Sequence, residues 1–112
     1  MGIFIGVDIE KIIRFKNLDK KVLNKIFTNQ EIKYCMSKKN NAQHFAVRFA
    51  GKEAIIKAFS SFKKKIELKE IEILNDEKNV PIVKLKNAKK YDIKISLSHN
   101  QEDAIAFVLV SK

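Results

Sequence analysis

The distribution of apolar and polar residues predicts one long helix and several strands. Residues Ile3 to Ile9 form an apolar, β-branched run, which is typical of a strand buried on both faces. From about Ala42 to Phe62, apolar residues including Phe45, Phe49 and Phe59 recur at helical spacing, which predicts a helix with a core-facing stripe. The pattern therefore predicts a core formed between a long helix and strands.

Shorter elements complete the predicted fold. A lysine-rich helix is expected from Glu10 to Lys25, and the sequence Thr28-Asn29-Gln30-Glu31 has the form of a capping box that opens a further helix to about Lys38. Neither a repeat nor a low-complexity linker divides the chain, so residues 1–112 are predicted to form a single α+β domain with an antiparallel sheet packed on the long helix. The later strands are expected at Lys69 to Leu74, Val80 to Leu85, Lys94 to Ser98 and Ala104 to Val110.

The long helix carries an acid and a base on its apolar face. Glu53 and Lys57 are four residues apart and therefore point in the same direction, beside Phe49 and Ile56. Such a pair is very often only a solvated ion pair. If the pair is buried instead, it needs compensation, which a metal ion and a polyphosphate would supply together.

Two further polar residues stand near the ends of predicted strands. Asp8 interrupts the apolar N-terminal run, where it serves either as a cap for the following helix or as a buried acid with a function. His99 follows the alternating segment at 94–98, where it is either a hydrogen-bonded turn histidine or a site residue. The residues alone leave both pairs of alternatives open.

The charge of the chain favours a polyanionic partner. The formal net charge is +10, and Arg14 and Arg48 are the two arginines in a chain that otherwise uses lysine, which marks them for planar, bidentate contacts. A basic nucleic-acid-binding module without catalysis would account for the charge and the eight phenylalanines. That alternative leaves Asp8 and Glu53 unexplained, and it requires exposed aromatic residues on strands rather than on a helix stripe.

Composition also gives an expectation about the compartment. The single cysteine, Cys35, cannot form an internal disulfide, and no apolar stretch approaches the roughly 20 residues of a membrane span. We therefore expect no membrane association and a cytoplasmic location, or an organelle lumen if a targeting segment has been removed.

The order and spacing of four segments resemble the holo-acyl-carrier-protein synthase family, the small phosphopantetheinyl transferases. The matching segments are Gly6-Val7-Asp8-Ile9-Glu10 followed by Arg14, Phe27 to Glu31, Arg48 to Ala58, and Ser96 to His99. The resemblance implies the 4'-phosphopantetheinyl transferase fold and a homotrimer with active sites at subunit interfaces. It also implies Mg²⁺-dependent transfer of the phosphopantetheine arm of coenzyme A to a serine of apo acyl carrier protein, with release of adenosine 3',5'-bisphosphate, as in fatty acid biosynthesis.

The resemblance also implies roles for individual residues. Asp8 and Glu53 are expected to bind Mg²⁺, and the serine proton is expected to pass to Glu53 or to a metal-bound water. Lys57 is expected to stabilise the charge that develops on the phosphoryl and leaving oxygens. Three further residues are expected to hold the phosphates of coenzyme A: Arg48, Lys52 and His99.

Carrier recognition is assigned, again by resemblance, to the predicted first helix and its flank. The expected contacts to the acidic helix of the carrier are Arg14, Lys21 and Lys25, with Leu18 as an apolar anchor. The chain departs from the family where Ser60 and Ser61 replace a glycine-rich turn, and where Asn79 replaces a glycine before Pro81. Asparagine tolerates the left-handed backbone conformation that glycine would supply.

Overall fold

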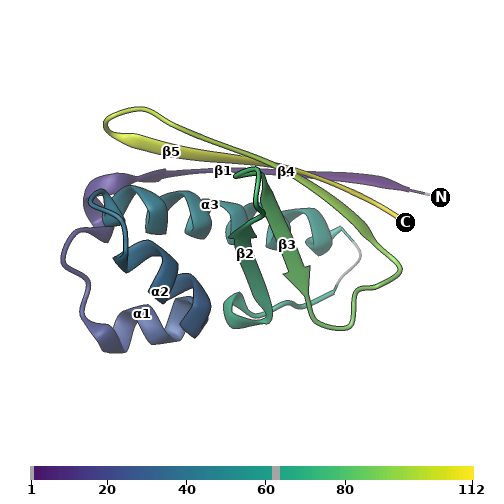
Figure 1. The fold of residues 1–112 in the computed structure, drawn as a ribbon. Coiled ribbons are helices and arrows are strands. Elements are labelled where there is room, and N and C mark those ends of the chain that lie inside the picture. The colour runs from purple at the N-terminus through teal and green to yellow at the C-terminus, as the bar shows by residue number, and fades with distance from the viewer. Residues whose placement is uncertain (1, 62–63) are drawn as a thin grey trace.

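The computed structural model describes residues 2–61 and 64–112, and it confirms the predicted α+β class with antiparallel pairing (Figure 1). Helix α3 lies between a sheet and the remaining elements. The elements in chain order are β1 (Ile3–Lys11), the 3-10 turn η1 (Ile12–Phe15), α1 (Lys20–Ile26), α2 (Asn29–Met36), α3 (Asn41–Ser60), η2 (Leu68–Glu70), β2 (Ile71–Asn75), β3 (Pro81–Leu85), β4 (Asp92–His99) and β5 (Asp103–Ser111).

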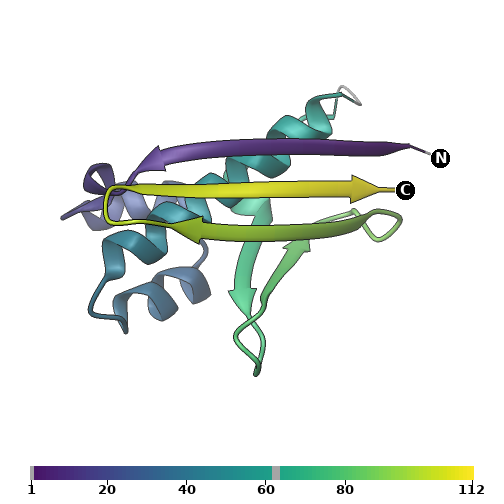
Figure 2. The same cartoon turned by 90° about the horizontal axis from the view of Figure 1, so that it is seen from above.

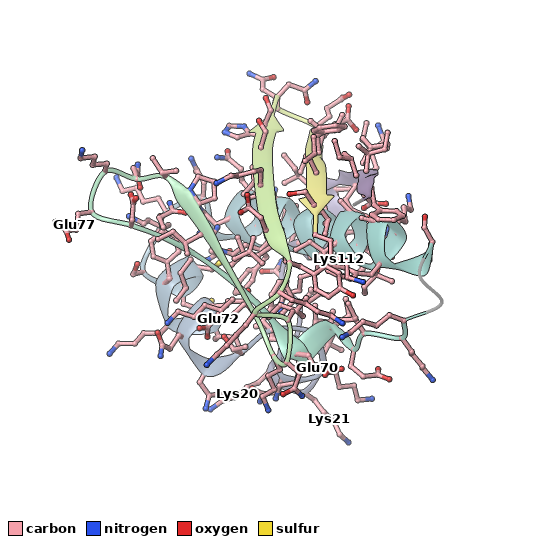
Figure 3. The ribbon with its side chains drawn as sticks, turned by 90° about the vertical axis from the view of Figure 1, so that its right-hand side faces the viewer. Lys20, Lys21, Glu70, Glu72, Glu77 and Lys112 are labelled. Atoms are coloured by element: carbon pink, nitrogen blue, oxygen red, sulfur yellow. The ribbon has the colours of Figure 1, made fainter. Side chains whose placement is uncertain are left out.

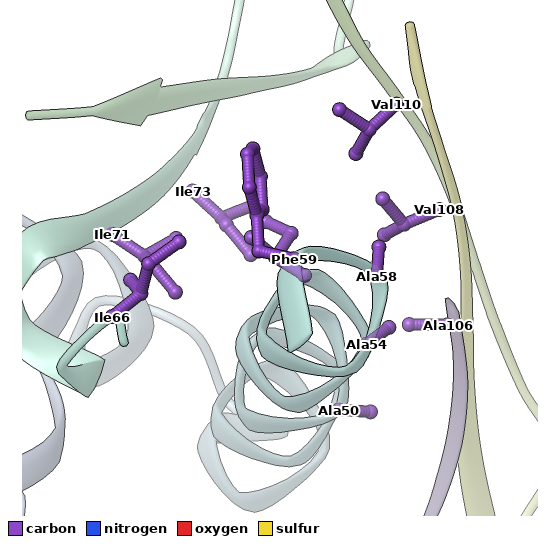
Figure 4. Close-up of a cluster of buried hydrophobic side chains, with 11 residues drawn as sticks. Ala50, Ala54, Ala58, Phe59, Ile66, Ile71, Ile73, Ala106, Val108 and Val110 are labelled. Carbon is purple, nitrogen blue, oxygen red and sulfur yellow. The ribbon is translucent and has the colours of Figure 1, made fainter. Parts of the chain in front are cut away.

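The larger sheet has three strands in the order β1-β5-β4, each pair antiparallel, and it lies along one side of α3 (Figure 2). The hairpin of β2 and β3 forms a separate two-stranded sheet. The main core lies where β2 and β5 pack on opposite sides of the end of α3, with Ile71 and Ile73 on one side and Val108 and Val110 on the other (Figure 4). Of the predicted aromatic stripe, Phe45 and Phe59 are buried.

Small side chains let β1 and β5 approach α3 closely. Ala50, Ala54 and Ala58 are fully buried and face β5 at successive turns of the helix (Figure 4). Gly6 lies so close to the helix that an added Cβ would be 1.9 Å from the carbonyl oxygen of Ala54. This contact brings Asp8, two residues further along β1, against the second half of α3.

The predicted helix from Glu10 to Lys25 is wrong in its first half. Strand β1 continues to Lys11 because Glu10 and Lys11 pair with Ala104 and Asp103, and the Lys11 ammonium forms a 2.8 Å salt bridge with Asp103. The turn η1 follows, Asn17 has a positive φ of 57°, and α1 begins only after Asp19, whose carboxylate accepts from Val22 N at 2.9 Å. Asp19 is therefore the helix cap, and Asp8 lies within a strand.

Other local predictions are confirmed. Thr28 and Glu31 form the capping box that opens α2. Asn79 adopts the left-handed conformation, with φ of 66°, in the turn between β2 and β3. Helix α3 ends at Ser60, while Phe62, the predicted end, lies outside the described residues, as does Lys63.

The expectation that Ile3 to Ile9 is buried on both faces is wrong for a single chain. Alternate residues of β1 point away from α3, and Ile5 and Ile9 are each 62% exposed. Because directly paired antiparallel residues share a face, Ile105 and Phe107 of β5 extend the same surface. We call this surface the outer face of the sheet, and its exposed apolar members are Ile3, Ile5, Val7, Ile9, Ile105 and Phe107.

Candidate active site

The candidate site lies where β1 crosses the second half of α3. Asp8 is 9% exposed, and its Oδ1 accepts a hydrogen bond of 3.0 Å from the Lys57 ammonium, which also donates to the carbonyl oxygen of Val7 at 3.0 Å. The second carboxylate oxygen of Asp8, Oδ2, is buried and has no hydrogen-bond partner within residues 2–61 and 64–112. A buried carboxylate oxygen without a donor is costly, which marks Oδ2 as a position prepared for a ligand.

Glu53 joins Asp8 and Lys57 at this position. Burial and the negative charge of Asp8 raise the pKa of the Glu53 carboxyl, while the Lys57 ammonium opposes the rise. The predicted pairing of Glu53 and Lys57 on one helix face is thus part of a three-residue arrangement with Asp8, and not an isolated surface ion pair.

Glu10 is a residue of this region that the sequence did not assign. Burial raises its pKa to about 7, and the neighbouring carboxylates of Asp8 and Glu53 raise it further, while the Arg14 guanidinium opposes the rise. Glu10 and Asp8 are two residues apart on β1 and therefore share a face of the sheet. The two-residue spacing of Asp8 and Glu10 could have identified Glu10 from the sequence. It did not, because the helix was predicted to begin at Glu10 and the strand to end before it.

The carboxylates Asp8 and Glu53 fit a magnesium ion that is also coordinated by a phosphate of the substrate. In the described part of the chain, no three His, Cys, Asp or Glu side chains form a group that could hold a metal by themselves. Mg²⁺ is usually bound by one or two carboxylates together with substrate phosphates and water. Asp8, through its unsatisfied Oδ2, and Glu53 meet that smaller requirement.

Lys52 does not have the predicted position near a phosphate. Its ammonium is fully buried and lies 2.6 Å from the Glu31 carboxylate. It also donates to three backbone carbonyl oxygens, those of Ile26, Leu68 and Ile71, at 2.8 to 3.1 Å. The prediction is wrong because these acceptors use the whole ammonium group in the interior.

Arg48 is likewise a structural residue. It is 2% exposed, its Nε donates to the Ile73 carbonyl oxygen at 3.0 Å, and its Nη2 donates to Asn75 at 3.3 Å. Its guanidinium carbon lies 4.5 Å from the ring centroid of Tyr34. The predicted contact with coenzyme A is therefore wrong. The planar guanidinium is used within the protein instead, where it donates hydrogen bonds and lies over the Tyr34 ring.

His99 remains accessible at the end of β4. It is exposed, and its Nε2 lies 2.9 Å from the side-chain nitrogen of Gln43 near the start of α3. The strand register places His99, Ala104 and Glu10 on one rung of the sheet, so His99 points to the side that carries Glu10. A polar hollow of about 520 Å³ adjoins this end of α3 and is lined by Lys16, Lys39 and Gln43 among others.

The charged residues predicted to recognise the carrier are accessible to a partner. The Arg14 side chain is 63% exposed, and Lys21 and Lys25 are exposed on α1. Lys20 and Lys21 project outward from the lower edge of the molecule (Figure 3). Leu18 is half-buried against a second cluster of buried side chains, which includes Phe15, Leu23 and Phe45. This packing reduces the apolar surface that Leu18 offers to a partner.

Comparison with known proteins identifies the family. Residues 4–108 match the family model described as "4'-phosphopantetheinyl transferase superfamily". The chain belongs to this superfamily. The resemblance drawn from the four sequence segments is thereby confirmed.

Individual relatives support the same conclusion over nearly the whole length. The chain is 42% identical to the holo-[acyl-carrier-protein] synthase of Thermodesulfovibrio yellowstonii, covering 96% of each chain, and 37% identical to that of Clostridium tetani, covering 95% of this chain and 93% of the relative. A Bacillus anthracis holo-(acyl-carrier-protein) synthase solved in complex with CoA (3',5'-ADP) superposes with a TM-score of 0.83 at 29% identity, covering 96% and 94% of the two chains. The transferase fold predicted from the resemblance is thus present.

One further observation concerns membranes. Among the helices of the described residues, none is both long and apolar enough to cross a bilayer.

Proposed function

We propose that this protein is a holo-acyl-carrier-protein synthase, which transfers the 4'-phosphopantetheine arm of coenzyme A to a serine of apo acyl carrier protein. Adenosine 3',5'-bisphosphate is the second product. The observation that carries the proposal is that synthases of this name match over 93% to 96% of their own length, while Asp8, Glu53 and Lys57 meet at one place in the fold.

Asp8 and Glu53 would hold the Mg²⁺ ion. When bound, the ion would polarise the phosphoryl oxygens of coenzyme A and offset their negative charge. The unsatisfied Oδ2 of Asp8 supports this assignment, since it lies beside the accessible Lys57 and yet has no donor in the described chain.

Glu53 and Lys57 have distinct roles in the proposed reaction. Glu53 accepts the proton of the carrier serine as the serine oxygen attacks the β-phosphorus and the bond from that phosphorus to the departing adenosine 3',5'-bisphosphate breaks. The side chain of Lys57 is 55% exposed, so its ammonium can contact the phosphoryl oxygens while it stays near Asp8. There it stabilises the developing negative charge.

His99 and the adjoining hollow would hold the nucleotide end of coenzyme A. Lys16 and Lys39 give this hollow positive charge, which suits a phosphate group. On the carrier side, Arg14, Lys21 and Lys25 would bind acidic side chains, with Leu18 as a half-buried apolar contact. The basic net charge of +10 favours both anionic partners.

The active assembly is proposed to be a homotrimer that acts in the cytoplasm, in fatty acid biosynthesis. The outer face of the sheet supports association, because it exposes six apolar side chains that a monomer leaves in water. A second copy that covers this face would bury β1 on both sides, as its apolar sequence predicts.

The direct test combines the purified protein with coenzyme A and an apo acyl carrier protein, with and without Mg²⁺, and weighs the carrier by mass spectrometry. We expect the mass of one phosphopantetheine group to be added only with the metal present. An unmodified carrier under all conditions would overturn the proposed activity, and full modification in the presence of excess chelator would overturn the metal assignment.

A further inference from the structure

Arg14 lies between the proposed carrier-binding surface and the acidic site. Its Nη1 donates to Glu10 Oε1 at 2.6 Å, and the two side chains differ sharply in exposure, with Arg14 63% exposed and Glu10 only 9% exposed. One end of this ion pair therefore faces solvent, and the other end lies within the protein.

The inner end of the pair belongs to the same charged group as the proposed metal ligands. Glu10 and Asp8 share one face of β1, and Asp8 contacts Lys57 on the helix face that also carries Glu53. Arg14 places its positive charge 2.6 Å from the Glu10 carboxylate. Arg14 thus reduces the negative potential that Asp8, Glu10 and Glu53 present to a cation.

The outer end of the pair is positioned to meet an acidic partner. The 3-10 turn that carries Arg14 is held by the hydrogen bond from Ile12 N to the Glu102 carbonyl oxygen at 2.9 Å, and the guanidinium lies 6.0 Å from the ring centroid of the buried Phe15. A guanidinium has five N–H donors, so Arg14 can bind Glu10 and an acidic carrier side chain at the same time.

From this geometry we propose that Arg14 couples carrier docking to the affinity of the metal site through Glu10. An acidic carrier side chain on Arg14 partly neutralises the guanidinium, which makes the potential at Asp8 and Glu53 more negative. The carrier therefore tightens cation binding, and by thermodynamic reciprocity the cation tightens carrier binding. This inference rests on the proposed function, and it makes Arg14 a positioning residue for the site and not only a contact for the partner.

The test measures Mn²⁺ affinity by water-proton relaxation, with coenzyme A present and with or without an apo carrier whose acceptor serine is replaced by alanine. Without carrier, Arg14→Gln should bind Mn²⁺ about two- to fivefold more tightly than the unmodified protein, because a nearby positive charge is removed. Lys78→Gln removes an exposed charge in the turn between β2 and β3 and is the matched control, while Arg14→Lys keeps the charge. Both should stay within about twofold of the unmodified protein.

Addition of saturating carrier completes the test. Mn²⁺ affinity should rise about threefold to tenfold in the unmodified protein and in Lys78→Gln, but clearly less in Arg14→Gln. An equal carrier-induced rise in Arg14→Gln and Lys78→Gln, or unchanged Mn²⁺ affinity in carrier-free Arg14→Gln, overturns the coupling.

Asp8→Asn, measured in parallel, separates this inference from the proposed function. If Asp8→Asn loses Mn²⁺ binding while Arg14→Gln behaves as Lys78→Gln does, the metal site stands and the coupling alone is wrong. If Asp8→Asn binds Mn²⁺ as the unmodified protein does, the proposed metal site fails and the coupling fails with it.

Discussion

Helix α3 carries two lysines that each pair with a carboxylate from another element, and the two pairs have opposite character. Lys52 and Glu31 are both fully buried, and the Lys52 ammonium also donates to three backbone carbonyl oxygens. Lys57 is 55% exposed, and its partner Asp8 keeps one buried oxygen without a donor among the described residues. A completed set of hydrogen bonds indicates a structural pair, whereas an incomplete set at an accessible position indicates a site for a ligand.

The neighbours of each pair reinforce the contrast. Glu31 also accepts from Thr28 N at 2.9 Å and from Ile73 N at 2.7 Å, so the Lys52–Glu31 pair joins α2, α3 and β2. Around Asp8, by contrast, Glu10 and Glu53 bring the number of carboxyl groups to three, against the two positive charges of Lys57 and Arg14. The first arrangement stabilises a corner of the fold, and the second leaves charge for a cation to neutralise.

Breaking the buried pair should have the largest effect on folding. Glu31→Ala leaves the Lys52 ammonium buried without its carboxylate, and we expect a loss of about 3 to 5 kcal/mol in the free energy of unfolding. Urea denaturation followed by circular dichroism measures this loss. The double variant Glu31→Leu with Lys52→Met should recover part of the stability, and a single variant as stable as the unmodified protein would refute the structural role.

Removing a proposed metal ligand should instead affect activity and spare the fold. Asp8→Asn and Glu53→Gln should each lower the rate of carrier modification by at least about 100-fold, since each removes a ligand charge. The free energy of unfolding should change by less than about 1 kcal/mol, because neither substitution alters volume. Modification at near the unmodified rate by either variant contradicts the ligand assignment, with Glu77→Gln in the distant hairpin as the control.

Truncation of the accessible lysine should have a smaller effect, on turnover. Lys57→Ala should lower kcat by about 10- to 100-fold while the KM for coenzyme A changes little, since the ammonium acts most strongly as charge shifts in the transition state. Steady-state kinetics with varied coenzyme A distinguishes the two parameters. A change confined to KM would assign Lys57 to substrate binding.

Charge reversal on the carrier-binding surface should have the smallest effect. Arg14→Glu together with Lys21→Glu should weaken carrier binding by about tenfold and leave coenzyme A binding unchanged, because these residues are proposed to face the carrier. Calorimetry measures the affinity for the carrier and for coenzyme A separately. The loss of carrier affinity should diminish at high salt. Equal losses for both ligands would show that the surface is not specific for the carrier.

Assembly provides a test of a different kind. Light scattering should report about three times the chain mass of 12.9 kDa. Arg or Glu substitution at Ile5, at the centre of the outer face, should shift the protein towards monomers, whereas the same change at exposed Val80 should not. Subunit mixing tests whether one site uses residues of two chains. If Asp8 and His99 of one site come from different subunits, mixing an inactive Asp8 variant with an inactive His99 variant should restore some activity. A fully active monomer would exclude the trimer.

The sequence by itself determined several local elements, and it singled out Asp8, Glu53 and Lys57 as candidate site residues. Capping at Thr28, the left-handed turn at Asn79 and the period of α3 depend on neighbours within a few residues, so the local pattern predicted them. The motif that contains Glu53 and Lys57 indicated an acid and a base on one helix face, and the contact with Asp8 joined that face to the N-terminal strand.

Tertiary structure alone decided which charges are buried, which are satisfied and which remain accessible. Lys52 and Lys57 look alike in the sequence, yet only the packing of α1, η2, β2 and the capping box of α2 gives Lys52 its four acceptors. Likewise, only the pairing of β1 with β5 kept Glu10 in a strand and brought it beside Asp8. Such contacts join residues far apart in the chain, and their energies depend on burial and on complete hydrogen bonding, which no local pattern of residues specifies.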